Sequence, residues 1–207
     1  MTVKLSQLCS EFTALLASNA PVPGGGGAAA LCGALASALC SMAGELSLGK
    51  KSTAAYTDEL LSLNTAAREK AQRFLSLIDA DAAAFEPLSR AYSIPKAAPD
   101  RVEKLSGASV TAATAPMDML TECLDTVALL QRMAEICSPI MLSDVGCAAS
   151  LCRTAAECAA MNVYVNLPGI ADADTARCFR EKTDSMLEAC AKQAGELSRT
   201  VLTKLRG

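Results

Sequence analysis

A helix built almost entirely from small residues constrains this chain more than any other feature. Residues 28–46 read AAALCGALASALCSMAGEL, and the whole stretch from Phe12 to Gly44 carries no charged side chain. Pro21, Pro23 and four consecutive glycines interrupt that stretch, and the part after them is too weakly apolar to predict a membrane span. A helix with small residues on every side instead indicates burial inside a tight helical bundle or at a subunit interface.

The composition favours an all-α fold. The 207 residues predict a single domain spanning 1–207, and 51% of them are hydrophobic although only 3% are aromatic. A core that lacks Trp and relies on Ala, Leu, Cys and Met must be thin and closely spaced, and Ala and Leu lead the helix-propensity scale. The net charge of −3, without a basic cluster, argues against a nucleic-acid partner.

The chain contains no histidine, which removes the commonest general base and the commonest metal ligand. Acid–base chemistry would therefore fall to Asp, Glu, Lys, Tyr or Cys. The ten cysteines include no Cys-x-x-Cys pair, and no signal peptide is recognisable. We therefore expect reduced thiols in a cytoplasmic protein, rather than disulfides or a metal site.

Apolar residues recur every three to four positions along most of the chain, which predicts six helices. We expect them at about 4–18, 28–46, 57–92, 100–137, 145–166 and 173–205. Pro116 predicts a kink or a break in the fourth helix, and Ser143 with Asp144 predicts a cap for the fifth. Since no segment alternates as a β-strand would, the predicted architecture is an antiparallel bundle of long helices.

The four glycines before the small-residue helix are the first candidate binding element. Gly24, Gly25, Gly26 and Gly27 place unshielded backbone N–H groups at a helix N-terminus, where the helix dipole favours negative charge. Glycines also allow a ligand or a second backbone to approach closely. The same pattern would equally suit a flexible joint.

Asp79 and Asp81 lie in the third predicted helix. Asp81 falls within about 60° of both Ile78 and Phe85, on the apolar side, whereas Asp79 points towards the flank. A carboxylate on an apolar stripe is unfavourable unless it is paired or functional. Acid–base chemistry and a stabilising ion pair at a solvated edge are therefore both open interpretations.

Three further groups could bind or transform a ligand. Asn162 and Asn166 lie on a small-residue face and need hydrogen-bond partners from the backbone, a second subunit or a ligand. Asp144 would lie about 27 Å from Asn162 along a continuous helix, so the two could serve one elongated ligand or two sites across a dimer. Lys50 and Lys51 follow the small-residue helix, where they could either cap its C-terminus in solvent or bind an anionic group of a ligand.

Taken in order, these motifs resemble a known family. The matching segments are PVPGGGGAAA at 21–30, GKK at 49–51, DADA at 79–82, AP at 115–116, SDVG at 143–146 and NVYVNL at 162–167. Over nearly the whole chain they are similar to the folate cyclodeaminase/cyclohydrolase family, which includes the C-terminal domain of formimidoyltransferase-cyclodeaminase and stand-alone methenyltetrahydrofolate cyclohydrolases. The resemblance implies an all-helical homodimer with a folate site in a cleft near the subunit interface. It implies no metal or other cofactor, and neither a nucleic acid nor a membrane as partner.

The resemblance also implies a reaction on the one-carbon bridge between N5 and N10 of tetrahydrofolate. Our first prediction is a cyclodeaminase, which closes 5-formiminotetrahydrofolate to the methenyl form and releases ammonia. The alternative is a cyclohydrolase, which adds water to the methenyl form and gives 10-formyltetrahydrofolate, and a further alternative is a non-catalytic helical dimer or folate-binding module. The predicted catalytic residues are Asp144, Asp81, Lys50 and Lys51. The predicted substrate-binding residues are Pro23, Gly24, Gly25, Gly26, Gly27, Asp79, Ser143, Asn162 and Asn166.

Overall fold

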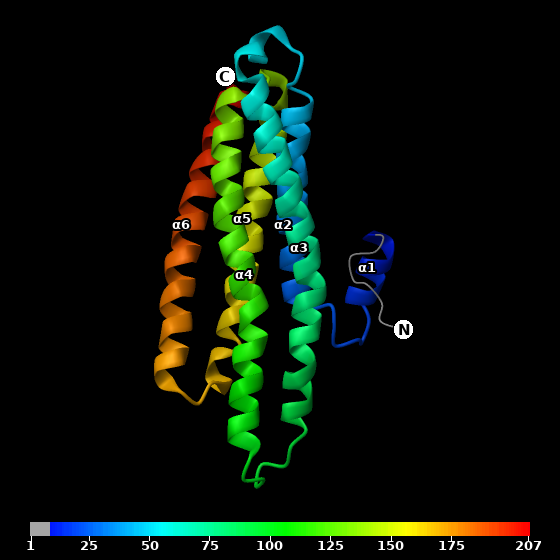
Figure 1. Ribbon diagram of the computed structural model, residues 1–207, viewed down its shortest axis with the longest axis vertical. Coiled ribbons are helices and arrows are strands. Elements are labelled where there is room, and N and C mark those ends of the chain that lie inside the picture. The colour runs from blue at the N-terminus through cyan, green and yellow to red at the C-terminus, as the bar shows by residue number, and fades with distance from the viewer. Residues whose placement is uncertain (1–8) are drawn as a thin grey trace.

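The computed structural model describes residues 9–207, and every regular element in this range is helical. Five long helices lie side by side along the long axis of the molecule (Figure 1). They are α2 (Gly25–Glu45), α3 (Thr57–Tyr92), α4 (Arg101–Ile136), α5 (Leu142–Tyr164) and α6 (Ala173–Arg206). The short α1 (Cys9–Leu16) lies to one side, and 3-10 turns at Lys51–Tyr56, Pro139–Met141 and Leu167–Gly169 occupy three of the connections. The predicted all-α class is confirmed for the described residues.

The small residues of α2 allow it to pack inside the molecule. The helix contacts α3, α4 and α5, and residues such as Ala30, Ala36 and Cys40 are fully buried. Gly33 lies so close to Phe74 that an added Cβ would come within 2.4 Å of the ring. By length and composition α2 could also cross a membrane, but 61% of its most apolar window is buried in the molecule. The expected burial of this helix is confirmed.

The start of α2 differs from the prediction. Gly24 is the residue that precedes the helix, and Gly25, Gly26 and Gly27 form its first turn instead of a separate turn. Neighbouring groups pack directly on this bare backbone, and a Cβ at Gly27 would lie 3.0 Å from the Cβ of Pro23. Close packing thus stabilises a helical turn that glycine propensity alone disfavours.

The cap predicted for α5 is wrong, and of the kink or break predicted at Pro116 the break is absent. α4 runs as one helix through the buried Pro116, so the ring does not break it. Packing against α3, α5 and α6 holds the helical path on both sides of this proline. α5 begins at Leu142, so Ser143 and Asp144 lie inside its first turn and neither side chain caps it. The preceding 3-10 turn leads directly into the helix, which leaves no capping position for Ser143.

The other predicted helices agree closely with the structure. α3 has the predicted bounds, and the ends of α4 and α6 differ from the prediction by at most one residue. The predicted first helix, 4–18, lies partly outside the described residues, and its described part ends at Leu16. Phe12 attaches α1 to the rest of the molecule, since only 4% of this residue is exposed.

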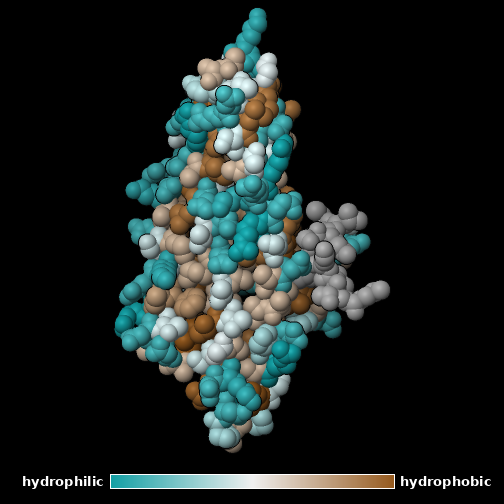
Figure 2. Space-filling model, in the orientation of Figure 1, coloured by the Kyte–Doolittle hydropathy of each residue, from teal (hydrophilic) through white to brown (hydrophobic). Residues whose placement is uncertain are grey.

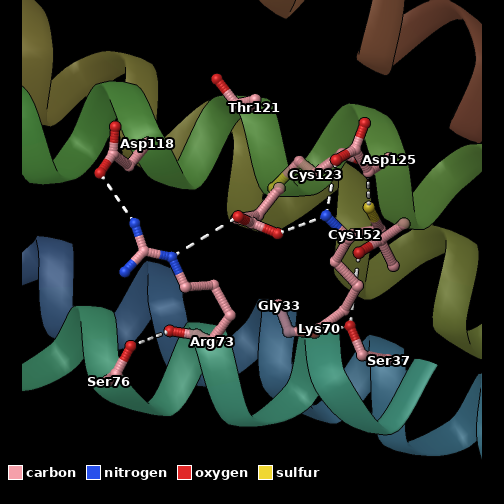
Figure 3. Close-up of polar contacts among 12 residues, drawn as sticks. Gly33, Ser37, Lys70, Arg73, Ser76, Asp118, Thr121, Cys123, Asp125 and Cys152 are labelled. Carbon is pink, nitrogen blue, oxygen red and sulfur yellow. Dashed lines mark hydrogen bonds and ion pairs between the residues drawn. The ribbon is translucent and has the colours of Figure 1, made fainter. Parts of the chain in front are cut away.

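Ion pairs join α3 to α4 near the middle of these helices. Hydrophilic residues gather over this part of the surface (Figure 2). Lys70 Nζ lies 2.7 Å from Glu122 and 2.6 Å from Asp125, and Arg73 lies 3.0 Å from Asp118 (Figure 3). The side chains of Lys70 and Glu122 are only 24% and 15% exposed, so water screens this pair less than an ordinary surface pair. The network helps to hold the two helices in register.

The nine cysteines from Cys32 to Cys190 are all free thiols. Cys40, Cys123, Cys152 and Cys190 are fully buried in the core. Burial raises the pKa of the Cys40 thiol to about 12, which keeps it protonated and unreactive at neutral pH. Cys40 therefore acts as a small core side chain.

Alanine at two helical glycines should have opposite effects on stability. Gly33→Ala would drive a methyl group into the buried ring of Phe74, so we expect a loss of about 1–3 kcal/mol from overpacking. Gly107→Ala lies on α4 with no atom within 4 Å of the new Cβ, so we expect a gain of about 0.5–1 kcal/mol. Urea denaturation measures the free energy of unfolding of both variants. A Gly33→Ala protein that is as stable as the wild type would contradict the packing of α2 on α3.

Candidate functional site

The glycine run, Asp81 and the two asparagines come together in one pocket at the start of α2. Its volume is about 150 Å³, and its walls come from α2, the segment before it, α3, α4, α5 and the segment after α5. The lining residues are Pro21, Val22, Gly24, Gly25, Gly26, Asp81, Phe85, Ala112, Asn162, Val165 and Asn166. We call this the glycine pocket.

Asp81 lies directly against the backbone of α2. A Cβ at Gly26 would lie 2.4 Å from both carboxylate oxygens of Asp81, so only glycine leaves room for this carboxylate. The first turn of α2 has N–H groups without helical partners, and their partial positive charge favours an ionised carboxylate. Burial has the opposite effect and raises the pKa of Asp81 from 3.8 to about 6. The group is therefore mostly ionised at neutral pH but can still exchange a proton readily.

Asn162 and Asn166 form the α5 side of the glycine pocket. Asn162 Nδ2 donates a 2.8 Å hydrogen bond to the carbonyl of Cys158, and Asn166 Nδ2 donates a 2.8 Å hydrogen bond to the carbonyl of Asn162. Both amide nitrogens are thus turned towards the helix backbone. Each amide oxygen is left to accept a hydrogen bond from a ligand.

A second polar group lies where α2 ends. Lys50 Nζ donates a 3.1 Å hydrogen bond to Ser138 Oγ, and the backbone N–H of Ser138 donates a 2.8 Å bond to Ser47 Oγ. Thr53 Oγ1 donates to the carbonyl of Ser47. Ser47 and Ser138 were not predicted as site residues. The sequence around a serine in a connection does not indicate a hydrogen-bond partner about ninety positions away.

Three more predicted site residues lie close in the chain to members of this second group. Ser143 and Asp144 begin α5, shortly after Ser138, and Lys51 adjoins Lys50. Ser143 and Lys51 are exposed, whereas Asp144 and Lys50 are half-buried.

The structure therefore divides the predicted site residues between two ends of the molecule. The start of α2 adjoins Asn162, whereas the segment after α2 adjoins Ser138, so α2 and α5 run in opposite directions. α5 is continuous, which places Asp144 about 27 Å from Asn162 along the helix. Because Asp81 shares the glycine pocket with Asn162, Asp81 and Asp144 of one chain do not meet at the same ligand atom.

Asp79 and Pro23 do not line the glycine pocket. Asp79 is half-buried on α3, and Pro23 is buried beside Gly27 after a cis peptide bond. Phe85 does line the pocket, although it was not predicted as a site residue. Its position four residues after Asp81 on the same stripe was the available signal. Among residues 9–207 no group of three His, Cys, Asp or Glu side chains could hold a metal ion.

Known proteins match this chain over most of its length. A family model described as formiminotransferase-cyclodeaminase matches residues 8–185. Methenyltetrahydrofolate cyclohydrolase of Methylorubrum extorquens is 33% identical over 190 residues, which cover 90% of this chain and 89% of that protein. Formimidoyltransferase-cyclodeaminase of Mus musculus is 27% identical over 198 residues, which cover 94% of this chain but only 36% of the mouse protein.

The fold is also similar to a solved structure. Formiminotetrahydrofolate cyclodeaminase of Thermotoga maritima superposes with a TM-score of 0.82 and 27% identity, over 95% of this chain and 98% of that chain. The family resemblance predicted from the ordered motifs is therefore confirmed. The chain belongs to the formiminotransferase-cyclodeaminase family.

Proposed function

We propose that this chain is a methenyltetrahydrofolate cyclohydrolase. The observation that carries the proposal is its 33% identity with a protein of that name, over about nine-tenths of both chains. Identity with the mouse and Thermotoga cyclodeaminases is lower, at 27%. These comparisons therefore support a cyclohydrolase, which was the alternative predicted from the sequence, better than a cyclodeaminase, which was our first prediction.

The glycine pocket contains a group suited to this reaction. Water adds to the methenyl carbon, and the bond from that carbon to N5 then breaks, leaving a formyl group on N10. The water oxygen becomes the formyl oxygen, so the water must lose both of its protons. N5 gains one proton as its bond to the carbon breaks, and the other is released to solvent. Asp81 is suited to accept the proton of water, since its raised pKa of about 6 lies close to neutral pH. Its negative charge would also stabilise the cationic methenyl bridge.

The proposal includes a cytoplasmic homodimer without a metal or other cofactor. In one chain, Asp144 lies about 27 Å from Asn162, too far to reach the same reacting carbon. A second copy of the chain would let Asp144, Lys50 and Lys51 reach the glycine pocket of its neighbour. Lys50 or Lys51 of the second copy would donate the proton to N5, or hold a carboxylate of the substrate outside the pocket.

Mixing two inactive variants tests this shared site. We expect Asp144→Asn to abolish turnover without unfolding the protein, as we expect for Asp81→Asn. If each site combines Asp81 of one copy with Asp144 of the other, a mixed dimer has one intact site out of two. Random exchange makes about half of the dimers mixed, so about a quarter of wild-type activity returns. Activity is measured after co-refolding equal amounts of both variants. No recovery, in a sample shown to contain mixed dimers, would refute a site that combines Asp81 of one copy with Asp144 of the other.

The acid limb of the pH profile should report Asp81. Because burial raises its pKa to about 6, the basic form is lost as pH falls through that value. We therefore expect kcat/KM to fall about tenfold per pH unit well below pH 6 and to level off above it. Initial rates between pH 4 and 8 check this expectation. A profile that is flat down to pH 4.5 would exclude Asp81 as the general base.

A cyclodeaminase is the second candidate, and the TM-score of 0.82 with the Thermotoga enzyme favours it. The ultraviolet absorbance of the methenyl bridge separates the two reactions. Enzyme-dependent loss of absorbance from methenyltetrahydrofolate supports the cyclohydrolase. Appearance of that absorbance from 5-formiminotetrahydrofolate, with release of ammonia, supports the cyclodeaminase. If neither signal changes while tetrahydrofolate still raises the melting temperature, a non-catalytic folate-binding module is the correct interpretation.

A further inference from the structure

No cationic side chain of the same chain lines the glycine pocket. Asp81 is the one ionisable residue among those that line it, and its carboxylate already faces the N-terminal turn of α2. A helix N-terminus would otherwise attract an anion, but here a protein carboxylate occupies that position. A ligand carboxylate that entered the pocket would therefore meet a like charge without a counter-ion.

The amide groups add further acceptors. Asn162 and Asn166 turn their nitrogens towards backbone carbonyls, which orients each amide and directs its oxygen away from the helix backbone. With the two oxygens of Asp81, the polar side chains of the pocket present mainly acceptors. Such a pocket selects a ligand edge that is rich in N–H donors.

The size and shape of the pocket narrow the choice further. A volume of about 150 Å³ is small beside the roughly 300–1,000 Å³ of pockets that enclose a whole drug-sized ligand. One end of an elongated ligand would fit. Phe85, Val22 and Val165 supply apolar walls, which suit the faces of a flat ring.

We propose that the glycine pocket binds the pterin ring of the folate, with Asn162 and Asn166 accepting hydrogen bonds from its amino group and ring N–H groups. The glutamate tail, which carries carboxylates, lies outside this pocket. Asn162 and Asn166 are thus positioning residues, because they fix the ring and with it the N5–N10 bridge. This inference rests on the proposed action on a folate, but not on which of the two reactions occurs.

Binding of two fragments to the full chain tests the inference. The ring-only probe is 6-methyltetrahydropterin, and the tail-only probe is 4-aminobenzoylglutamate. We expect calorimetry to show that the ring probe binds the wild-type protein and that the tail probe does not displace it. Failure of the ring probe to bind, or its displacement by the tail probe, would overturn the proposal. This comparison needs no variant, so it is independent of any folding defect.

Variants then assign the binding to the two asparagines. Asn162→Ala and Asn166→Ala should each weaken binding of the ring probe about tenfold, because each change leaves an N–H donor of the ligand without its acceptor. The matched control is Met161→Ala, which lies next to Asn162 but is 65% exposed and outside the pocket. Ring binding that is unchanged in both asparagine variants would overturn the proposal. If asparagine-dependent ring binding occurs without turnover of either folate, the proposed reaction fails while the pterin assignment holds.

Discussion

Replacing Asp81 with asparagine should lower turnover of methenyltetrahydrofolate by about 100-fold to 10,000-fold, the usual contribution of a general base. Asparagine has nearly the same shape as aspartate, so it should fit against Gly26 as the carboxylate does. It lacks the negative charge and cannot accept the proton of water. Loss of methenyl absorbance at pH 7.5 measures the rate. Unchanged turnover would remove Asp81 from the mechanism.

The stability of Asp81→Asn distinguishes a chemical effect from unfolding. Folding raises the pKa of Asp81 from 3.8 to about 6, so its ionisation destabilises the folded protein as pH rises through that interval. Asp81→Asn should therefore be more stable than the wild type at pH 8, and this difference should shrink towards pH 4. The matched control is Glu86→Gln on the same helix, whose exposed ion pair with Arg90 lies outside the pocket. The control should keep its activity.

Gly26→Ala should lower turnover by about 100-fold with a smaller effect on stability, because a displacement of about 1 Å at a catalytic group has consequences of that size. The added Cβ would lie 2.4 Å from both carboxylate oxygens of Asp81, so the carboxylate must move away from α2. The rest of the helix keeps its packing. Turnover and melting temperature of the purified variant measure the two effects separately.

Gly107→Ala is the matched control for Gly26→Ala. It makes the same change inside a helix, but no atom lies within 4 Å of the new Cβ. Its activity should equal that of the wild type. If Gly26→Ala keeps full activity, the close contact between α2 and Asp81 does not position the reacting carboxylate.

The helical architecture could be predicted because it depends on local spacing. The seam of α3 follows from steps of three and four residues, and its bounds at Thr57 and Tyr92 agree with the prediction. The same periodicity placed Asp81 on the apolar side of that helix, where the structure has it half-buried beside Phe85. Helix starts were harder to predict. Gly25 is helical despite its low helix propensity, and Ser143 lies inside α5 because the preceding 3-10 turn leads directly into that helix.

The residue types of the candidate site could be recognised in the sequence, because a glycine run, a carboxylate on an apolar stripe and amides on a small-residue face are local anomalies. Their grouping was not, because hydrogen bonds such as Lys50 to Ser138 join residues far apart in the chain. The sequence by itself determined the helices, the family and the candidate residues. Only the tertiary structure decided that Asp81 and Asn162 share a pocket while Asp144 lies at the other end, since this depends on the direction in which α2, α3 and α5 pack.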